Sequence, residues 1–157
     1  MKKLTALSLT TGILCGIWIL LSSFLGIPSW VGFAGCTAFF AAGGKVKGFK
    51  KAIFTTLIGV FWAMTIITIS SYINIPYSSA ISTALITFIM CYQANISLFS
   101  FIPGTFIGAF STFAAQGNWK LIVPALILGI ILGIACESSG DHLFKTLSEE
   151  STANSNI

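Results

Sequence analysis

The sequence predicts an all-α integral membrane protein with six transmembrane helices, arranged as two inverted three-helix repeats. Hydrophobic residues make up 55% of the 157 residues and charged residues only 8%, and the mean hydropathy is +0.95. Soluble domains carry about a quarter charged residues, so this chain lacks the polar surface that water requires. Long charge-free tracts and a duplicated proline motif complete the prediction.

Three apolar tracts contain no charged residue: 4–44, 52–119 and 121–136. A membrane-spanning helix needs about 20 apolar residues, so each of the first two tracts must hold more than one crossing. The chain begins with two lysines and an apolar run, but the run is longer than a secretory signal and no small-residue cleavage site follows. We therefore expect an uncleaved first helix.

The proline motif Phe24-x-x-Ile27-Pro28 recurs 75 positions later as Phe99-x-x-Ile102-Pro103. The same shift aligns Ser22 with Ser97, Thr37 with Thr112 and Lys45 with Lys120. We interpret this as an internal duplication, with a first repeat at 1–75, a second at 76–140 and a polar tail at 141–157. Because each repeat holds three crossings, the second must enter the membrane in the opposite sense.

In the first repeat, a helix is expected at 4–27. Its Gly12-x-x-x-Gly16 spacing marks a face that another helix backbone can approach closely. Pro28 suits the first turn of the next helix, at 29–43, which is short for a crossing. Four lysines within 45–51 predict a solvated loop, and a third helix follows at 52–72.

In the second repeat, a turn at 74–79 precedes helices at 80–98, 103–115 and 121–136, of which the middle one is again short. In the last helix, Ala125, Gly129 and Gly133 recur at every fourth position and predict a close-packing stripe. The polar segment beyond Glu137 ends in a tail that we expect to be disordered.

Lysine positions predict the orientation. With the N-terminus inside, only Lys120 lies outside, and seven lysines are cytoplasmic: Lys2, Lys3, Lys45, Lys47, Lys50, Lys51 and Lys145. This is the bias that cytoplasmic loops carry, and it puts both termini in the cytoplasm. Because the lysines stand only at the ends of apolar runs, we expect contacts with membrane lipids and none with nucleic acid.

The two proline steps, Ile27-Pro28 and Ile102-Pro103, are candidate solute-binding elements. If they converge inside the membrane, the N–H groups of the short helices face a shared cavity, which Gly104 and Thr105 would line. The alternative is that Pro28 and Pro103 only end one helix and start the next.

Gln93 and Asn95 are two amides deep in an apolar stretch, followed by the hydroxyl of Ser97. Buried amides are costly unless they find partners, so they either line a polar pathway or bond to a neighbouring helix. The hypothetical pathway comprises Pro28, Gln93, Asn95, Ser97, Pro103, Gly104 and Thr105.

No catalytic set is present, since the chain has one histidine and no recognisable catalytic or nucleotide-binding motif. We therefore expect no enzyme. Glu137, Asp141 and His142 form a possible metal or proton-relay cluster, but solvation at the membrane boundary explains them better. Four cysteines lack CxxC spacing and are interpreted as small packing residues: Cys15, Cys36, Cys91 and Cys136. We expect no metal and no cofactor.

The second proline step also carries a resemblance. Ile102-Pro103-Gly104-Thr105-Phe106, with Gly108, Ser111, Thr112 and Phe113, resembles the YcdZ-like family of small bacterial inner-membrane proteins of unknown function. The resemblance covers most of the chain apart from the tail. It implies a location in the bacterial cytoplasmic membrane and supplies no substrate or catalytic residue.

The function expected from the sequence is a passive channel or facilitator for a small neutral or weakly polar solute. No ionisable side chain lies in a predicted membrane core, where ion-coupled carriers keep them. A homo-oligomer is expected because 157 residues give thin walls around a pore. The alternative is a non-transporting membrane scaffold or accessory subunit. A continuous polar path favours the channel, and a dry, close-packed centre favours the scaffold.

Overall fold

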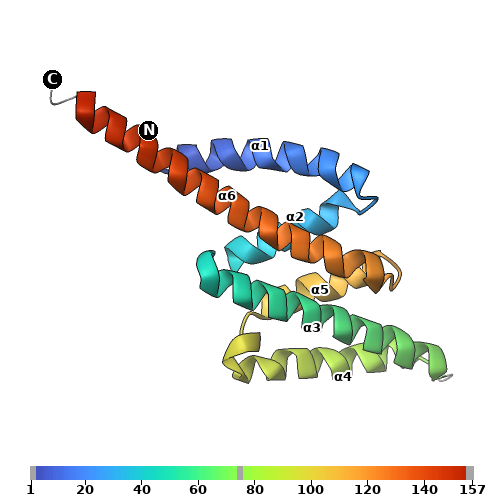
Figure 1. Cartoon of the computed structure of the whole chain (residues 1–157). Helices are drawn as coiled ribbons and strands as arrows, with labels where there is room; N and C mark the ends of the chain where they lie inside the picture. The colour runs from blue at the N-terminus through green and yellow to red at the C-terminus, as the bar shows by residue number, and fades with distance from the viewer. Residues whose placement is uncertain (1–2, 74–75, 155–157) are drawn as a thin grey trace.

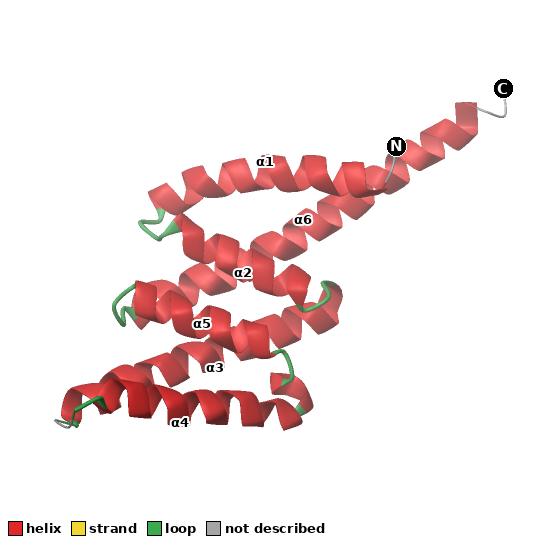
Figure 2. Cartoon of the chain, turned by 180° about the vertical axis from the view of Figure 1, so that it is seen from behind, coloured by secondary structure: helices red, strands yellow, loops and turns green. Residues whose placement is uncertain are grey.

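The computed structural model describes residues 3–73 and 76–154, and all regular structure in this part of the chain is helical (Figures 1 and 2). Two 3-10 turns, labelled η, accompany the α-helices in this part of the chain. The elements are α1 (Lys3–Phe24), α2 (Ser29–Ala41), α3 (Lys45–Tyr72), α4 (Ser78–Tyr92), η1 (Gln93–Asn95), η2 (Ser97–Phe99), α5 (Ile102–Ala114) and α6 (Trp119–Asn154).

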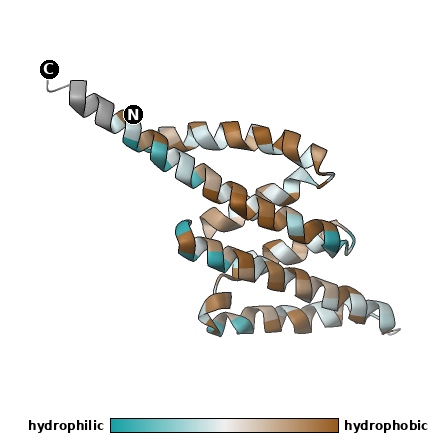
Figure 3. Ribbon diagram, viewed as in Figure 1, coloured by the Kyte–Doolittle hydropathy of each residue, from teal (hydrophilic) through white to brown (hydrophobic). Residues whose placement is uncertain are grey.

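Three helices, α1, α3 and α6, are long and apolar enough to cross a membrane. The apolar helices α2 and α5 have 13 residues each, or about 20 Å at 1.5 Å per residue, which is less than a bilayer core of about 30 Å. Hydrophobic residues cover most of the helices, whereas hydrophilic ones gather at helix ends and on the part of α6 beyond the bundle (Figure 3). This is the distribution of a helical membrane protein.

The first proline step is a tight helix–helix turn. Gly26 has a φ of +63°, which glycine adopts without steric cost, and the Ile27 amide donates to the Ser22 carbonyl at 3.1 Å. Pro28 then precedes the first residue of α2 with a φ of −69°. Glycine therefore ends one helix and proline begins the next.

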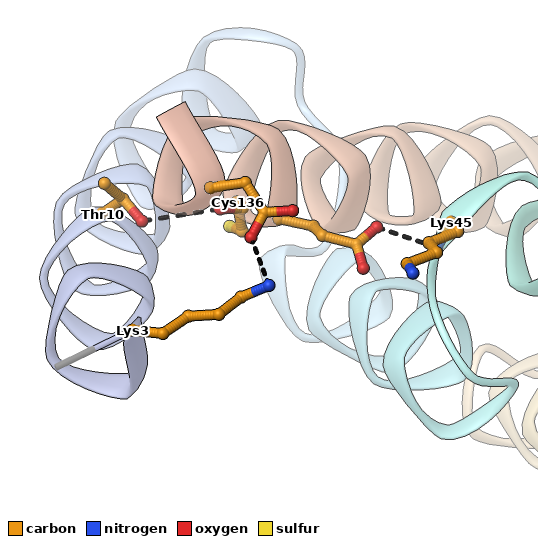
Figure 4. A network of polar contacts seen from close by, with 6 residues as sticks. Lys3, Thr10, Lys45 and Cys136 are labelled. Atoms are coloured by element: carbon orange, nitrogen blue, oxygen red, sulfur yellow. Dashed lines mark hydrogen bonds and ion pairs between the residues drawn. The ribbon is translucent and has the colours of Figure 1, made fainter. Parts of the chain in front are cut away.

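The lysine-rich segment 45–51 is the start of α3 and not the loop expected from its charge. Gly43 and Gly44 have positive φ values and reverse the chain just before it. The Lys45 amide donates to Glu137 Oε2 of α6 at 2.8 Å (Figure 4). Lysines near a helix N-terminus oppose the helix dipole, and this carboxylate offsets them.

The helix expected at 80–98 ends at Tyr92. Ile96 takes an extended conformation between η1 and η2, and the Asn95 side-chain amide donates to the Tyr92 carbonyl at 2.8 Å. The chain then enters α5, with Pro103 in its first turn. Gln93, Asn95 and Ser97 therefore lie on 3-10 turns and not on α4.

The last helix begins at Trp119 and continues to Asn154, far beyond the expected end at 136. Residues 141–154, expected as part of a disordered tail, are helical, and 155–157 lie outside the described residues. No glycine or proline follows Gly140, so nothing in this polar segment interrupts the helix. Lys3 of α1 forms an ion pair with Asp141 at 2.8 Å, which holds α6 against α1 where α6 leaves the bundle (Figure 4).

The short helices each pack on a long helix from the other part of the chain. α2 lies along α6, and α5 lies along α3 (Figure 1). α1 covers α6 on one side of the bundle, and α4 covers α3 on the other. Buried Val31, Val60, Ile122 and Leu126 join α2, α3 and α6 in one apolar cluster at the centre.

Candidate functional site

Glycines allow α5 and α3 to pack in close contact. A Cβ on Gly59 would overlap the Thr105 carbonyl, and one on Gly108 would overlap the Thr56 carbonyl. A Cβ on Gly104 would meet the Thr55 hydroxyl. Gly104 therefore lies against the Thr55 side chain of α3 and does not line the expected shared cavity.

The contact between α2 and α6 is built in the same way. Gly35 faces the Leu126 carbonyl, Gly129 faces the backbone of Gly32, and Gly133 faces the ring of Phe39. Ala125 is fully buried on the same stripe. The structure therefore places Ala125, Gly129 and Gly133 against α2.

These contacts put the two proline steps far apart. Residue numbers rise together along both glycine contacts, so α2 runs parallel to α6 and α5 runs parallel to α3. Lys45 at the start of α3 meets Glu137 in the second half of α6, so the long helices are antiparallel. The Pro28 and Pro103 steps consequently lie at opposite ends of the bundle and do not meet at the expected shared cavity (Figures 1 and 2).

Gln93 and Thr105 are brought together with a third residue that the sequence did not single out. The Trp62 indole donates to Gln93 Oε1 at 3.0 Å, and Gln93 Nε2 donates to the Thr105 hydroxyl at 3.4 Å. Thr105 is fully buried and Gln93 is half-buried. These hydrogen bonds connect η1 to α3 and α5. They match the alternative in which the Gln93 amide bonds to a neighbouring helix.

Asn95 and Ser97 do not join that network. Asn95 is exposed and its amide bonds locally to Tyr92. Ser97 is also exposed, and its carbonyl accepts a hydrogen bond from the Ser100 hydroxyl at 2.8 Å. Of the seven residues of the hypothetical pathway, Gln93, Thr105 and the neighbouring Gly104 and Pro103 lie at one place, whereas Pro28 lies at the other end.

Hydroxyl groups line the interface of α3 and α5. Thr55, Thr56 and Thr112 are fully buried, and each donates to a carbonyl one turn earlier on its own helix, at 2.6, 2.8 and 2.9 Å. Ser111 Oγ is buried without a hydrogen-bond partner among the described residues. The equivalent contact of α2 with α6 is apolar, with Val31, Ala38 and Phe39 buried.

The acidic residues at the exit of α6 have separate structural partners. Glu137 caps α3 through the Lys45 amide, and Asp141 pairs with Lys3 (Figure 4). His142 lies with Leu143 and Thr146 along a shallow, open surface hollow. The capping role of Glu137 was missed because it depends on a residue 92 positions away, although the uncapped Gly43-Gly44-Lys45 start was visible.

Two of the cysteines pack in the bundle. Cys36 and Cys136 are buried in one apolar cluster with Trp18 and Leu132. Cys15 is half-buried and Cys91 is exposed. Over residues 3–73 and 76–148, no group of three His, Cys, Asp or Glu side chains is arranged to hold a metal ion.

The glycines of α1 are unlike those of the bundle. A Cβ added at Gly12 or Gly16 would have no atom within 4 Å, and both residues are exposed. The face predicted to accept another helix is thus open in the single chain.

Comparisons with known proteins identify the family of this chain. The model of a protein family of unknown function, DUF1097, matches residues 8–141. The chain is 48% identical to "Inner membrane protein YcdZ" of Escherichia coli K12 over 142 residues, which cover 89% of this chain and 87% of that protein. It is 46% identical to the Salmonella typhimurium protein of the same name, over 89% of each chain.

A more distant relative is "Uncharacterized protein YahC" of Escherichia coli K12, which is 30% identical over 91% of this chain and 94% of its own length. No solved structure matches the chain. The resemblance to the YcdZ-like proteins is therefore confirmed, and two of these relatives are named as inner-membrane proteins. The chain belongs to the DUF1097 family, whose function is unknown.

Proposed function

We propose that this chain is a non-transporting membrane subunit that assembles with further copies of itself through α1. The observation that carries the proposal is the open face of Gly12 and Gly16. Within α2, α3, α5 and α6, by contrast, glycines are pressed against a neighbouring helix: Gly32, Gly35, Gly59, Gly104, Gly108, Gly129 and Gly133.

The open face of α1 lies opposite the side that packs on the bundle. Ala6, Trp18 and Ser22 are buried, and the Trp18 indole donates to the Ser29 carbonyl at 2.9 Å. Two positions along a helix turn it by about 200°, so Gly16 points away from Trp18. The outward face of α1 is therefore free to meet a partner in the membrane.

Small exposed residues extend this outward face along the helix: Thr5, Ser8, Gly12, Gly16 and Ser23. In lipid, such residues let two helix backbones approach and gain packing contacts that lipid tails do not provide. A second copy of α1 offers the same surface, so a symmetric pair satisfies both chains.

The closed centre of the bundle supports the absence of transport. Thr55, Thr56, Thr105 and Thr112 have no exposed surface, and three of their hydroxyls bond to their own helices. The glycine contacts leave no room there for even one methyl group. A solute crossing at this point would have to separate α3 from α5.

We also infer six crossings in two inverted halves, with both termini in the cytoplasm. The buried positions of α2 (31, 32, 35, 36, 38 and 39) recur in α5 after a shift of 73 residues (104, 105, 108, 109, 111 and 112). Those of α3 (52, 55, 56, 59 and 60) recur in α6 after a shift of 70 (122, 125, 126, 129 and 130). The antiparallel course of α3 and α6 fits the opposite insertion of the two halves, and the lysine bias supports the orientation.

The second candidate remains a passive facilitator for a small neutral or weakly polar solute. The observation that favours it is the set of buried hydroxyls on α3 and α5, among which Ser111 Oγ of α5 has no hydrogen-bond partner among the described residues. A buried, unpaired hydroxyl is costly, and a passing polar solute would satisfy it. This candidate requires a flux that depends on the hydroxyls of this interface.

The assembly proposal is tested with Gly12→Leu combined with Gly16→Leu. Two leucines keep the helix backbones apart, so we expect association to weaken by at least about tenfold, which is 1.4 kcal/mol. The measurement is energy transfer between labelled copies of the full chain in liposomes, over a range of protein-to-lipid ratios.

The matched control is Ile13→Leu combined with Ile17→Leu, at neighbouring positions that are 57% and 53% exposed. This pair conserves side-chain volume and should associate like the unmodified chain. Equal association of all three proteins, or none in the unmodified protein, would contradict assembly through α1.

A further inference from the structure

A cationic hollow lies between the start of α3 and the connection from α4 to α5. It has a volume of about 370 Å³ and is lined by Lys47, Lys50, Lys51, Ser97, Leu98 and Ser100. The lysines and the serines are far apart in the sequence, and the packing of α5 along α3 brings them together. The hollow is open to the surface, so its occupant can enter from the surroundings of the bundle.

The positive charge of the hollow is not neutralised within the described part of the chain. The one ion pair there joins Lys3 to Asp141, and Glu137 is engaged by the Lys45 amide. The N-terminus of α5 lies at the same end and adds the positive end of its helix dipole, whereas Glu137 caps the N-terminus of α3. Three lysines with no acidic partner favour a phosphate group as the ligand.

Apolar side chains continue from the lysines towards the membrane. Lys47, Lys51 and Phe54 share one face of α3, because they are spaced by four and then three residues. Phe54 is 45% exposed, and Ile96, next to the opposite wall, is 56% exposed. A ligand bound to the lysines would therefore meet apolar surface one turn further along the helix. This arrangement suits a phospholipid, which carries acyl chains next to its phosphate, and not a free anion.

We propose that this hollow binds the headgroup of an anionic phospholipid, with Lys47, Lys50 and Lys51 at the phosphate and with an acyl chain along Phe54. The opposite end of the bundle, where α6 begins, offers a single lysine, Lys120. The site is therefore confined to the end at which α3 begins, and it fixes the depth of α3 at that membrane surface. The inference does not depend on the assembly proposed above.

The test is native mass spectrometry of the full chain, released from detergent with phosphatidylglycerol or phosphatidylcholine. We expect the unmodified protein to retain phosphatidylglycerol at least about tenfold more tightly, and Lys47→Gln with Lys51→Gln to bind both lipids equally. Lys120→Gln with Lys145→Gln removes the same charge elsewhere and should keep the preference. Ser100→Glu, which brings a carboxylate into the hollow, should abolish the preference while leaving the lysines in place.

Three results would overturn the proposal. The first is equal retention of the two lipids by the unmodified protein. The second is an equal loss in both lysine pairs, which would mean that net charge alone acts. The third is displacement of phosphatidylglycerol by an equal concentration of inorganic phosphate, which would assign the hollow to soluble anions.

Discussion

Glycine has two opposite roles in this protein. A Cβ added at Gly59 or Gly108 would overlap the backbone of a neighbouring helix, whereas one added at Gly12 or Gly16 would enter open space. Sequence spacing alone treats the two sets alike, because a run of small residues marks a possible close approach without naming the helix that approaches. The structure separates internal packing from an open surface.

Gly59→Ala should destabilise the protein by about 1–3 kcal/mol, because a methyl group overlaps the Thr105 carbonyl and forces α5 away from α3. Gly12→Ala is the control, since open space surrounds it and alanine is the better helix former. Thermal unfolding in one detergent measures both. If the two variants unfold at the same temperature, the close contact of α3 and α5 is contradicted.

The hydrogen bonds of Gln93 could be predicted from the sequence only in part. Its amide lies in an apolar stretch and therefore needs partners, which sequence reasoning anticipated. That the partners are Trp62 and Thr105 depends on how η1 sits between α3 and α5. Asn95, two residues later, is exposed, because the chain there has left the α-helical period.

Apolar length predicted the existence of all six helices, but it did not predict where α4 ends or where α3 begins. The apolar run through 98 suggested a longer α4, but the extended Ile96 interrupts it. Charge suggested a loop at 45–51, but Glu137 caps the helix start from α6. Neither boundary follows from the residues nearby, because both depend on packing between distant segments.

Glu137→Gln should loosen the start of α3. A neutral amide can still accept the Lys45 N–H bond but no longer offsets the lysines, so we expect a loss of about 0.5–2 kcal/mol. Amide hydrogen exchange over residues 45–49 should become faster. Asp141→Asn, which removes only the exposed pair with Lys3, should leave this exchange unchanged, and unchanged exchange in Glu137→Gln would refute the cap.

At the scale of the whole molecule, the halves interlock, since the short helix of each packs on the long helix of the other. The sequence motif repeats after 75 residues, but the buried positions repeat after 73 in the short helices and 70 in the long ones. The repeat of buried positions therefore aligns Lys120 with Lys50, whereas the repeat of the sequence motif aligned it with Lys45. The repeated motif was visible in the sequence, whereas the packing of each short helix on the long helix of the other part of the chain, which separates the proline steps, was not.

This interlocked packing closes the middle of the bundle. The most direct test of this closure is the swelling rate of liposomes that contain the purified full chain, measured by stopped flow with a panel of small neutral solutes. We predict the rate of protein-free liposomes for every solute, and the same rate for Thr105→Val. Faster swelling by the unmodified protein that Thr105→Val reduces would contradict the closed centre and establish a solute path between α3 and α5.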